Sequence, residues 1–374
     1  MPDRRLTLTV IAASFVLVGV MTTLTGVLLP FLSRQYAMPP ATTAWMFPAQ
    51  FCCGATGVVS SGIVLRRFGF RVALGLGYAL LASGAALFAL ATWPAILAGV
   101  CLYGIGIGTL NPSSNLAMGT LSRRGPVMVN VLNFCWGTGA VGGPMILPAL
   151  LARYGAGAIA FLLAPLMAAA CLGIVLISPH GPVASEPGPA DDGTANALLS
   201  GAMLLFYVGT ETTIAGWMPL YGMRTLGANT FQTGLTLSIV WGALLTGRAA
   251  APFLVSRVGI DRMLRSSFLL LAAGIVTIAA VHTLPGLMAG CAISGLGLAT
   301  IFPNVVAAYT SSGGRNVSVV FLMASAGGAT LPWVAGRIVG ATGYPLAALI
   351  PAATATMVLV GLWAILRRRL ALSA

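Results

Sequence analysis

The chain has 374 residues, of which 58% are hydrophobic and only 7% are charged, and its mean hydropathy is +0.97. A soluble globular protein needs more polar residues than this to cover its surface, so the composition excludes that class. The net charge of +13 comes from nineteen arginines with no lysine; most lie in short segments between apolar runs, which is typical of membrane topology and argues against nucleic-acid binding.

Apolar runs of twenty or more residues follow one another along the whole chain. Each run is long enough to cross the ~30 Å hydrocarbon layer of a bilayer as a helix. The first run lacks a cleavage-site pattern, so we expect it to be an uncleaved span. We predict an all-α membrane protein with twelve transmembrane helices, at about residues 7–32, 42–65, 72–92, 94–119, 127–152, 156–177, 198–223, 231–255, 263–283, 285–309, 316–339 and 343–366.

The arginines predict the orientation of these spans. With a cytoplasmic N-terminus, fourteen arginines fall in cytoplasmic segments and four fall on the opposite side, namely Arg34, Arg153, Arg224 and Arg337. Such an excess of positive charge marks the cytoplasmic side of a membrane protein. We therefore expect a multi-pass protein of the cell inner (plasma) membrane with both termini in the cytoplasm.

Residues 178–197 form the longest polar stretch and are rich in proline, glycine and acids. This composition is typical of a flexible connector. Six spans precede it and six follow. The predicted domains are therefore an N-terminal six-helix bundle (1–177), a cytoplasmic linker (178–197) and a C-terminal six-helix bundle (198–374).

The two halves of the chain resemble each other at a nearly constant offset. TTLTGVLLPFLSR (22–34) aligns with TTIAGWMPLYGMR (212–224), and AGVCLYGIGIGTLNP (98–112) aligns with AGCAISGLGLATIFP (289–303). Two pseudo-symmetric six-span repeats are the layout of a transporter with a binding site near the midplane. The positions that match are Thr22/Thr212, Thr23/Thr213, Gly26/Gly216, Arg34/Arg224, Arg67/Arg257, Gly69/Gly259, Gly104/Gly295, Gly106/Gly297, Thr109/Thr300 and Pro112/Pro303.

Glu211 is the only carboxylate within a predicted span. It lies in YVGTETTIAGW (207–217), about 20 Å from the predicted cytoplasmic end of its helix. An ionised side chain at that depth costs at least about 2.5–3.5 kcal/mol, so it should face a cavity or a partner. We predict that Glu211 carries the coupling proton; the alternative is a neutral glutamic acid that only packs helices.

Arg248 is the other charge within a span, about 13 Å from the predicted cytoplasmic face. Its long side chain could reach that face or make a gating contact, and a contact with Glu211 or the substrate is the alternative. Trp241 shares a helical stripe with Arg248 and is predicted to line the same cavity.

Neutral amides and aromatic rings recur inside the spans and suit a sugar or polyol. Amides bond hydroxyl groups, and aromatic faces stack on C–H surfaces. The alternative is hydrogen bonding between helices, which contributes about 0.6 kcal/mol per bond. The predicted substrate-binding residues are Gln50, Asn111, Asn115, Asn133, Trp136, Tyr207, Trp241 and Asn304.

GIVLRRFGFR (62–71) resembles the loop motif G-x-L-a-D-r-x-G-r-r of the major facilitator superfamily, and the resemblance extends over nearly the whole chain. Arg66 stands where the family has its aspartate, and Ser256 stands there in the second-half copy, PFLVSRVGIDR (252–262), so the usual charge contact of that aspartate does not carry over. The resemblance implies gating roles for Gly62, Arg67, Gly69, Arg71 and Arg257.

Within this superfamily, three regions resemble the fucose-permease branch of sugar/proton symporters: YVGTETTIAGW, NPSSNLAMG (111–119) with VNVLNFCWGTGAVGGP (129–144), and FPNVVAAYTSSGG (302–314). The fucose permease has acids in its first and fourth spans, which this chain lacks. Gly139, Gly143 and Pro144 instead resemble the fifth-span motif of antiporters.

Three functions therefore remain open. The first is proton-coupled uptake of a sugar or sugar-like solute, and the second is export of a drug or metabolite by the same fold. The third is a membrane receptor or scaffold, which the repeated halves and Glu211 disfavour. The expected partners are a small polar solute, protons and the lipid bilayer, without nucleic acid, and we expect a monomer that is not an enzyme. We expect no cofactor or metal. There is no lysine for a nucleotide-binding phosphate loop, and the histidines and cysteines form no metal-ligand pattern.

Overall fold

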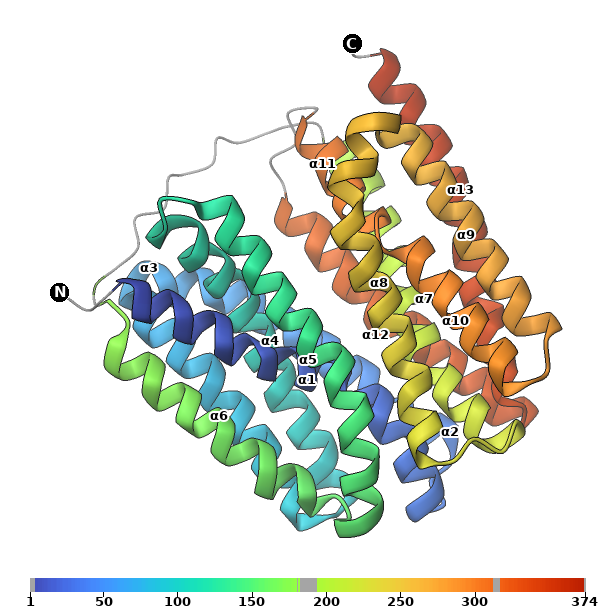
Figure 1. Cartoon of the computed structure of the whole chain (residues 1–374), viewed down its shortest axis with the longest axis horizontal. Helices are drawn as coiled ribbons and strands as arrows, with labels where there is room; N and C mark the ends of the chain where they lie inside the picture. The colour runs from blue at the N-terminus through green and yellow to red at the C-terminus, as the bar shows by residue number, and fades with distance from the viewer. Residues whose placement is uncertain (1–3, 180, 182–193, 312–316, 373–374) are drawn as a thin grey trace. The chain divides into compact units, whose positions relative to one another are not determined.

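The computed structural model describes residues 4–179, 181, 194–311 and 317–372 (Figure 1). Most of the predicted 178–197 linker lies outside the described residues. Every regular element in the described part is a helix: α1 Arg4–Gln35, α2 Pro40–Thr43, α3 Met46–Leu87, η1 Phe88–Leu90, α4 Trp93–Leu121, α5 Gly125–Tyr154, α6 Gly157–Ile177, α7 Thr194–Thr225, α8 Thr230–Val258, α9 Ile260–Ala280, α10 Leu284–Leu298, α11 Ile301–Ser311, α12 Val317–Thr342, η2 Pro345–Ala348 and α13 Leu349–Leu372.

Within the described residues, eleven helical segments are long and apolar enough to span a membrane. One of them, Pro40–Leu90, has 51 residues and would be about 76 Å long as a straight helix, more than twice the ~30 Å thickness of the hydrocarbon layer. Gly69 interrupts it with φ +81°, ψ −174°, a left-handed conformation that glycine adopts without strain. Counting its two arms separately gives the twelve spans that the sequence predicts.

The predicted span 285–309 is divided in two. α10 ends at Leu298 and α11 begins at Ile301. Pro303 explains the break, because it has no N–H to donate to the carbonyl of Ala299 and its ring crowds that carbonyl. The matching proline in the first half, Pro112, lies within the continuous helix α4, so the two repeats differ here.

The helices form two compact units. Unit 1 contains Met1–Phe31 and Pro48–Glu186, and unit 2 contains Leu32–Phe47 and Pro187–Ala374. The end of α1 and the whole of α2 are thus grouped with the second half of the chain, where α2 packs against α12. Aromatic side chains make this contact: Trp45 lies edge-on to Trp333 at 5.4 Å, and Phe47 lies 6.3 Å from Trp217.

The sequence repeat is visible in the backbone of both halves of the chain. The carbonyl of Leu32 accepts hydrogen bonds from two amides beyond the end of α1, and the carbonyl of Gly222, 190 residues later, does the same beyond α7. Gly69 and Gly259 have φ values of +81° and +79° at equivalent turns. The two halves therefore end their helices in the same way.

Glycines allow two equivalent helix pairs to approach closely. Gly139 of α5 lies against the backbone of Val16 in α1, and Gly327 of α12 lies against the backbone of Leu205 in α7. A Cβ atom at either position would overlap that backbone. Close packing through small residues is the usual way in which helices associate in a membrane.

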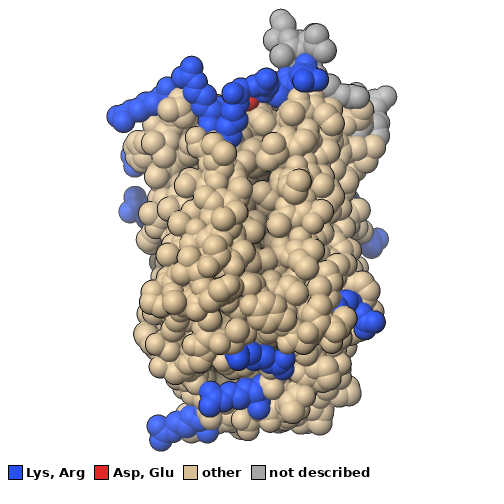
Figure 2. Space-filling model, turned by 90° about the vertical axis from the view of Figure 1, so that its right-hand side faces the viewer, with Lys and Arg blue, Asp and Glu red and all other residues tan. Residues whose placement is uncertain are grey.

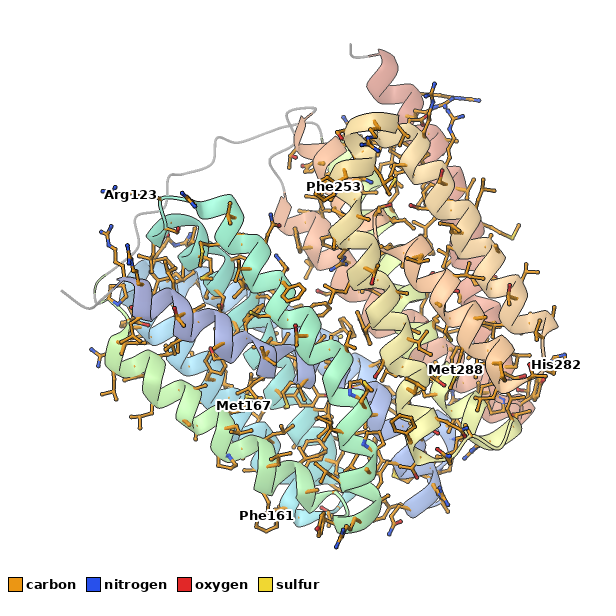
Figure 3. All side chains as sticks on the ribbon, in the orientation of Figure 1. Arg123, Phe161, Met167, Phe253, His282 and Met288 are labelled. Atoms are coloured by element: carbon orange, nitrogen blue, oxygen red, sulfur yellow. The ribbon has the colours of Figure 1, made fainter. Side chains whose placement is uncertain are left out.

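The outer faces of the helices are apolar, as expected for contact with lipid. Phe161 of α6 projects outward in Figure 3 and is 83% exposed, and Phe253 of α8 is 73% exposed. On the face in Figure 2, the arginines gather mainly along the upper and lower margins, and the wide middle is largely tan. This pattern agrees with a multi-pass membrane protein.

Candidate functional site

Glu211 lies in the middle of α7 and is buried. It is about 26 Å from the first residue of the helix and about 21 Å from the last. Only 8% of its surface is exposed. Of the residues that the structure describes, the only other acid is Asp261, which lies in the first turn of α9.

Three side chains of unit 2 meet at this carboxylate. The hydroxyl of Tyr207, one turn earlier on α7, donates a hydrogen bond to Oε1 of Glu211 at 3.0 Å. Nη2 of Arg248, on α8, donates to the Tyr207 hydroxyl at 3.3 Å and lies 4.0 Å from the same Oε1. Tyr207 therefore bridges the ion pair. Of the contacts foreseen for Arg248, the structure contains the one with Glu211.

Aromatic side chains surround the bridging tyrosine. The ring of Tyr207 is fully buried and lies 5.8 Å from the ring of Phe302 on α11, which lies 5.5 Å from that of Phe321 on α12. Trp241 is buried on α8, the helix that carries Arg248. These apolar side chains lower the local dielectric constant around the Tyr207 hydroxyl and strengthen its interactions with the charged groups.

Several donors in unit 2 are buried without a hydrogen-bond partner among the described residues, and two of them belong to residues of the predicted site. These two are Nε of Arg248 and Nδ2 of Asn304, whose residue is 7% exposed. A buried donor without an acceptor costs about 1–3 kcal/mol. Such groups are therefore candidates for contact with a ligand that has acceptor oxygens.

Unit 1 contains a second network, which has no charge. Thr25 donates to Oε1 of Gln50 at 2.5 Å, and the hydroxyl of Tyr103 lies 2.6 Å from that of Thr25. Gln50 also donates to the Thr22 carbonyl, and Nε1 of Trp136 donates to the Thr22 hydroxyl, both at 3.3 Å. The predicted residues Gln50 and Trp136 are thus joined through α1.

Sequence reasoning missed the roles of Thr22, Thr25 and Tyr103. A signal was present for the first, because the Thr22-Thr23 pair recurs as Thr212-Thr213 beside Glu211. Nothing in the sequence distinguishes Thr25 from the many threonines and serines that bond a carbonyl of their own helix, or Tyr103 from the other tyrosines within the spans.

The remaining predicted amides are not part of either network. Nδ2 of Asn115 donates to the carbonyl of Asn111 at 2.8 Å, and Nδ2 of Asn133 donates to the carbonyl of Val129 at 2.9 Å. Asn111 and Asn115 are half-buried on α4, and Asn133 is exposed on α5. The side-chain amides of Asn115 and Asn133 thus donate to their own helices, and their side-chain oxygens remain available as hydrogen-bond acceptors.

The predicted gating residues lie at turns between helices. Arg67 and Arg257 are exposed and come two residues before Gly69 and Gly259, whose positive φ values make the turns. Arg71 is half-buried at the start of the second arm of α3. At Gly62, by contrast, an added Cβ would meet nothing within 4 Å, so no packing demand explains that glycine.

No group of three or more potential metal ligands occurs among the described residues.

Comparison with known proteins gives one family. The sequence profile described as Major Facilitator Superfamily matches residues 11–314. A curated relative, "Bypass of stop codon protein 6" of Saccharomyces cerevisiae, is 24% identical over 386 aligned positions, covering 88% of this chain and 76% of the relative.

Solved transporter structures have the same fold. A bacterial homologue of the human lysosomal transporter Spinster, in an inward-facing and occupied conformation, superposes with a TM-score of 0.76 at 14% identity, covering 100% of this chain and 97% of that one. A POT family transporter in complex with a thioalcohol-conjugated peptide gives 0.75 at 14%, with 96% of each chain covered. The Escherichia coli fucose:proton symporter gives 0.65 at 16%, with 96% and 98% covered.

Proposed function

The chain belongs to the major facilitator superfamily and is a multi-pass membrane transporter rather than an enzyme, and we propose that it takes up a sugar or sugar-like polar solute together with protons. In this proposal the protein works by alternating access between two six-helix bundles. It acts as a monomer in the inner membrane, with both termini in the cytoplasm.

One observation carries the proposal: a buried carboxylate at mid-helix depth has an arginine 4.0 Å away. When Glu211 is ionised, Arg248 and Tyr207 stabilise it; when it is protonated, the ion pair is lost and Arg248 is free to bond another acceptor. Proton binding and substrate binding then share the same groups, which is what coupling requires.

The donors of the site support an oxygen-rich substrate. Nε of Arg248 and Nδ2 of Asn304 are buried without an acceptor, and the hydroxyl groups of a sugar supply acceptors. In unit 1, Gln50 and Trp136 are held in place by Thr22, and we propose that they contact the substrate too. Asn111, Asn115, Asn133, Tyr207 and Trp241 complete the proposed binding set.

Export by proton antiport is the second candidate. The observation that favours it is the glycine motif of α5, where Gly139 lies against Val16 and Gly143 against Val20. Close packing of α5 on α1 accounts for these glycines without any reference to the direction of transport. We therefore place uptake first.

Gating is the proposed role of the turns that follow the second and eighth predicted spans. The charged residues assigned to this role are Arg67, Arg71 and Arg257, and Gly69 gives the first turn its backbone conformation. A positively charged turn can change its contacts as the bundles move. Gly62 belongs to this set by its place in the loop motif alone.

Transport by the Glu211→Gln variant tests the proposal. Glutamine keeps the shape and the hydrogen-bonding capacity but cannot titrate. In proteoliposomes, we expect the variant to retain substrate counterflow and to lose accumulation driven by a pH gradient. The substrate is first identified by a thermal-shift screen of sugars, polyols, nucleosides and cationic drugs.

Asp261→Asn is the matched control, because it removes the only other described carboxylate. We expect this variant to accumulate substrate as the wild type does. If Glu211→Gln still concentrates substrate under a pH gradient, Glu211 is not the coupling group. If the wild type itself shows no dependence on the gradient, the protein is a facilitator.

A further inference from the structure

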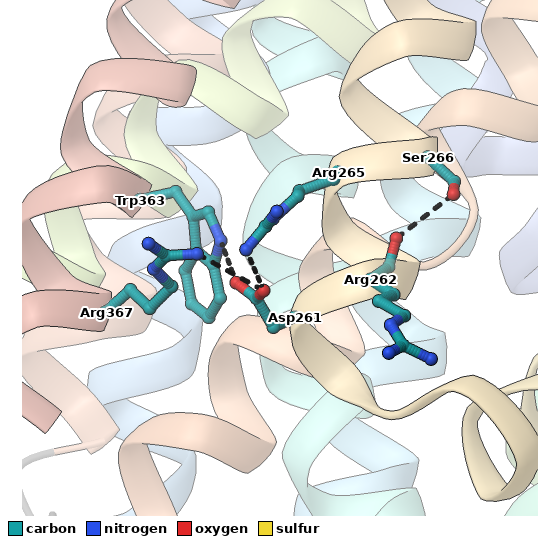
Figure 4. A network of polar contacts seen from close by, with 6 residues as sticks. All are labelled: Asp261, Arg262, Arg265, Ser266, Trp363 and Arg367. Carbon is teal, nitrogen blue, oxygen red and sulfur yellow. Dashed lines mark hydrogen bonds and ion pairs between the residues drawn. The ribbon is translucent and has the colours of Figure 1, made fainter. Parts of the chain in front are cut away.

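Three donors from two helices surround a single carboxylate at one end of unit 2 (Figure 4). Asp261, in the first turn of α9, forms an ion pair with Arg265 one turn later. From the last turns of α13, Nη1 of Arg367 lies 3.4 Å from Oδ2 of Asp261, and Nε1 of Trp363 donates to Oδ1 at 3.2 Å. Asp261 thus holds two arginines of different helices near each other.

The cluster carries an excess of positive charge. Arg262 follows Asp261 in the chain and Arg368 follows Arg367, and these four arginines against one carboxylate give a net charge of +3. Arg262 and Arg368 are exposed, and the guanidinium of Arg262 points away from Asp261 (Figure 4). The N-terminus of α9 adds its partial positive charge. This end of unit 2 is therefore built to attract an anion.

An apolar stripe continues from these arginines along α9. Leu269 follows Arg262 by seven residues and Arg265 by four, so it lies on the same helix face, and Val276 continues that face. Leu269 and Val276 are strongly exposed. The stripe from Arg262 to Val276 is about 21 Å long, which is sufficient to follow an acyl chain through half of a ~30 Å hydrocarbon layer.

A similar stripe occurs on α13, which packs against α9. From Arg368 the exposed face runs through Ile365 to Met357, a length of about 16 Å. Each helix thus has arginine at one end and exposed apolar side chains below it. A phospholipid has the same order of charge and apolar surface.

We infer that Arg262, Arg265, Arg367 and Arg368 bind the headgroup of an anionic phospholipid, whose acyl chains lie along α9 and α13. Guanidinium groups bind phosphate oxygens through paired N–H donors. Each arginine near an anionic lipid surface contributes about 1 kcal/mol. Asp261 is a positioning residue: it orients Arg265 and Arg367 and does not touch the lipid.

Thermal stability of the purified full-length protein in detergent tests this inference. The lipids are dioleoyl-phosphatidylglycerol and dioleoyl-phosphatidylcholine, which have the same acyl chains and differ in headgroup charge. We expect phosphatidylglycerol to raise the Tm in a saturable way and phosphatidylcholine to leave it unchanged. An equal shift with both lipids would overturn the inference.

Variants test which residues bind. The double variant Arg265→Gln/Arg367→Gln is expected to weaken phosphatidylglycerol binding about 30-fold, since ~1 kcal/mol per arginine is a factor of about five. The matched control is Arg153→Gln/Arg337→Gln, which removes two arginines predicted to lie on the other side of the membrane and should leave binding unchanged. An equal loss in both pairs would contradict the site.

The Asp261→Asn variant distinguishes a site in which Asp261 positions the arginines from a non-specific attraction by net positive charge. It raises the net charge of the cluster, so simple attraction predicts tighter binding, whereas loss of positioning predicts weaker binding. We expect binding to weaken severalfold, and tighter binding would overturn the inference. A further arm uses sn-glycerol 1-phosphate: if it shifts the Tm as far as phosphatidylglycerol does, the site takes a soluble phosphate and the lipid is not its ligand.

Discussion

The ion pair of unit 2 gives a prediction whose magnitude follows from its geometry. Two unit charges 4.0 Å apart attract by about 4 kcal/mol at an effective dielectric constant of about 20. Because 32% of the Arg248 side chain is exposed, solvent screens part of this energy, and we expect a coupling of about 1–2 kcal/mol.

A double-mutant cycle with Glu211→Gln and Arg248→Gln measures this coupling through the Tm of the purified protein. Each single variant leaves one charge without its partner, whereas the double variant leaves none. At about 2–4 °C per kcal/mol, we expect the Tm of the double variant to lie about 2–8 °C above the value predicted by adding the losses of the two single variants.

The control cycle combines Arg248→Gln with Asp261→Asn, because Asp261 forms its ion pairs with Arg265 and Arg367 and not with Arg248. We expect these two changes to be additive. Additivity within about 0.5 kcal/mol in the Glu211/Arg248 cycle as well would refute the ion pair. The Tyr207→Phe variant then gives the contribution of the bridging hydroxyl to the stability of the protein, which we expect to be about 1 kcal/mol.

Reporter fusions within 178–197 and after Arg369 should both give a cytoplasmic signal, because most arginines lie on that side; a periplasmic signal from either would contradict the topology. Gly327→Leu should lower the Tm by several degrees, because its neighbour is the backbone of α7, whereas Gly361→Leu, where an added Cβ meets nothing within 4 Å, should change it little. Similar losses would show that close packing at Gly327 is not needed. Asn133→Ala removes an exposed amide and should leave the Tm within about 1 °C while weakening substrate binding about two- to tenfold. A lower Tm with unchanged binding would make this amide structural.

The composition and the arrangement of apolar runs were sufficient to predict an all-helical membrane protein with two related halves. A lipid environment leaves the backbone no other partner than itself, so a long apolar run has to form a helix. The sequence also paired Gly69 with Gly259, and the structure gives both a positive φ, a conformation that glycine adopts without strain. These features depend on residues that are close together in the chain, so they can be predicted from the sequence alone.

The contacts between helices depended on the tertiary structure. The sequence drew attention to Glu211 and Arg248 because charge is scarce within spans, but it placed Arg248 only by its depth. The ion pair and the tyrosine that bridges it follow from the way in which α8 packs on α7. Thr25 and Tyr103 in unit 1 show the same limit of sequence reasoning. The residue type does not reveal whether a hydroxyl group bonds its own helix or another one. Which partner it takes is decided when helices distant in the chain pack together.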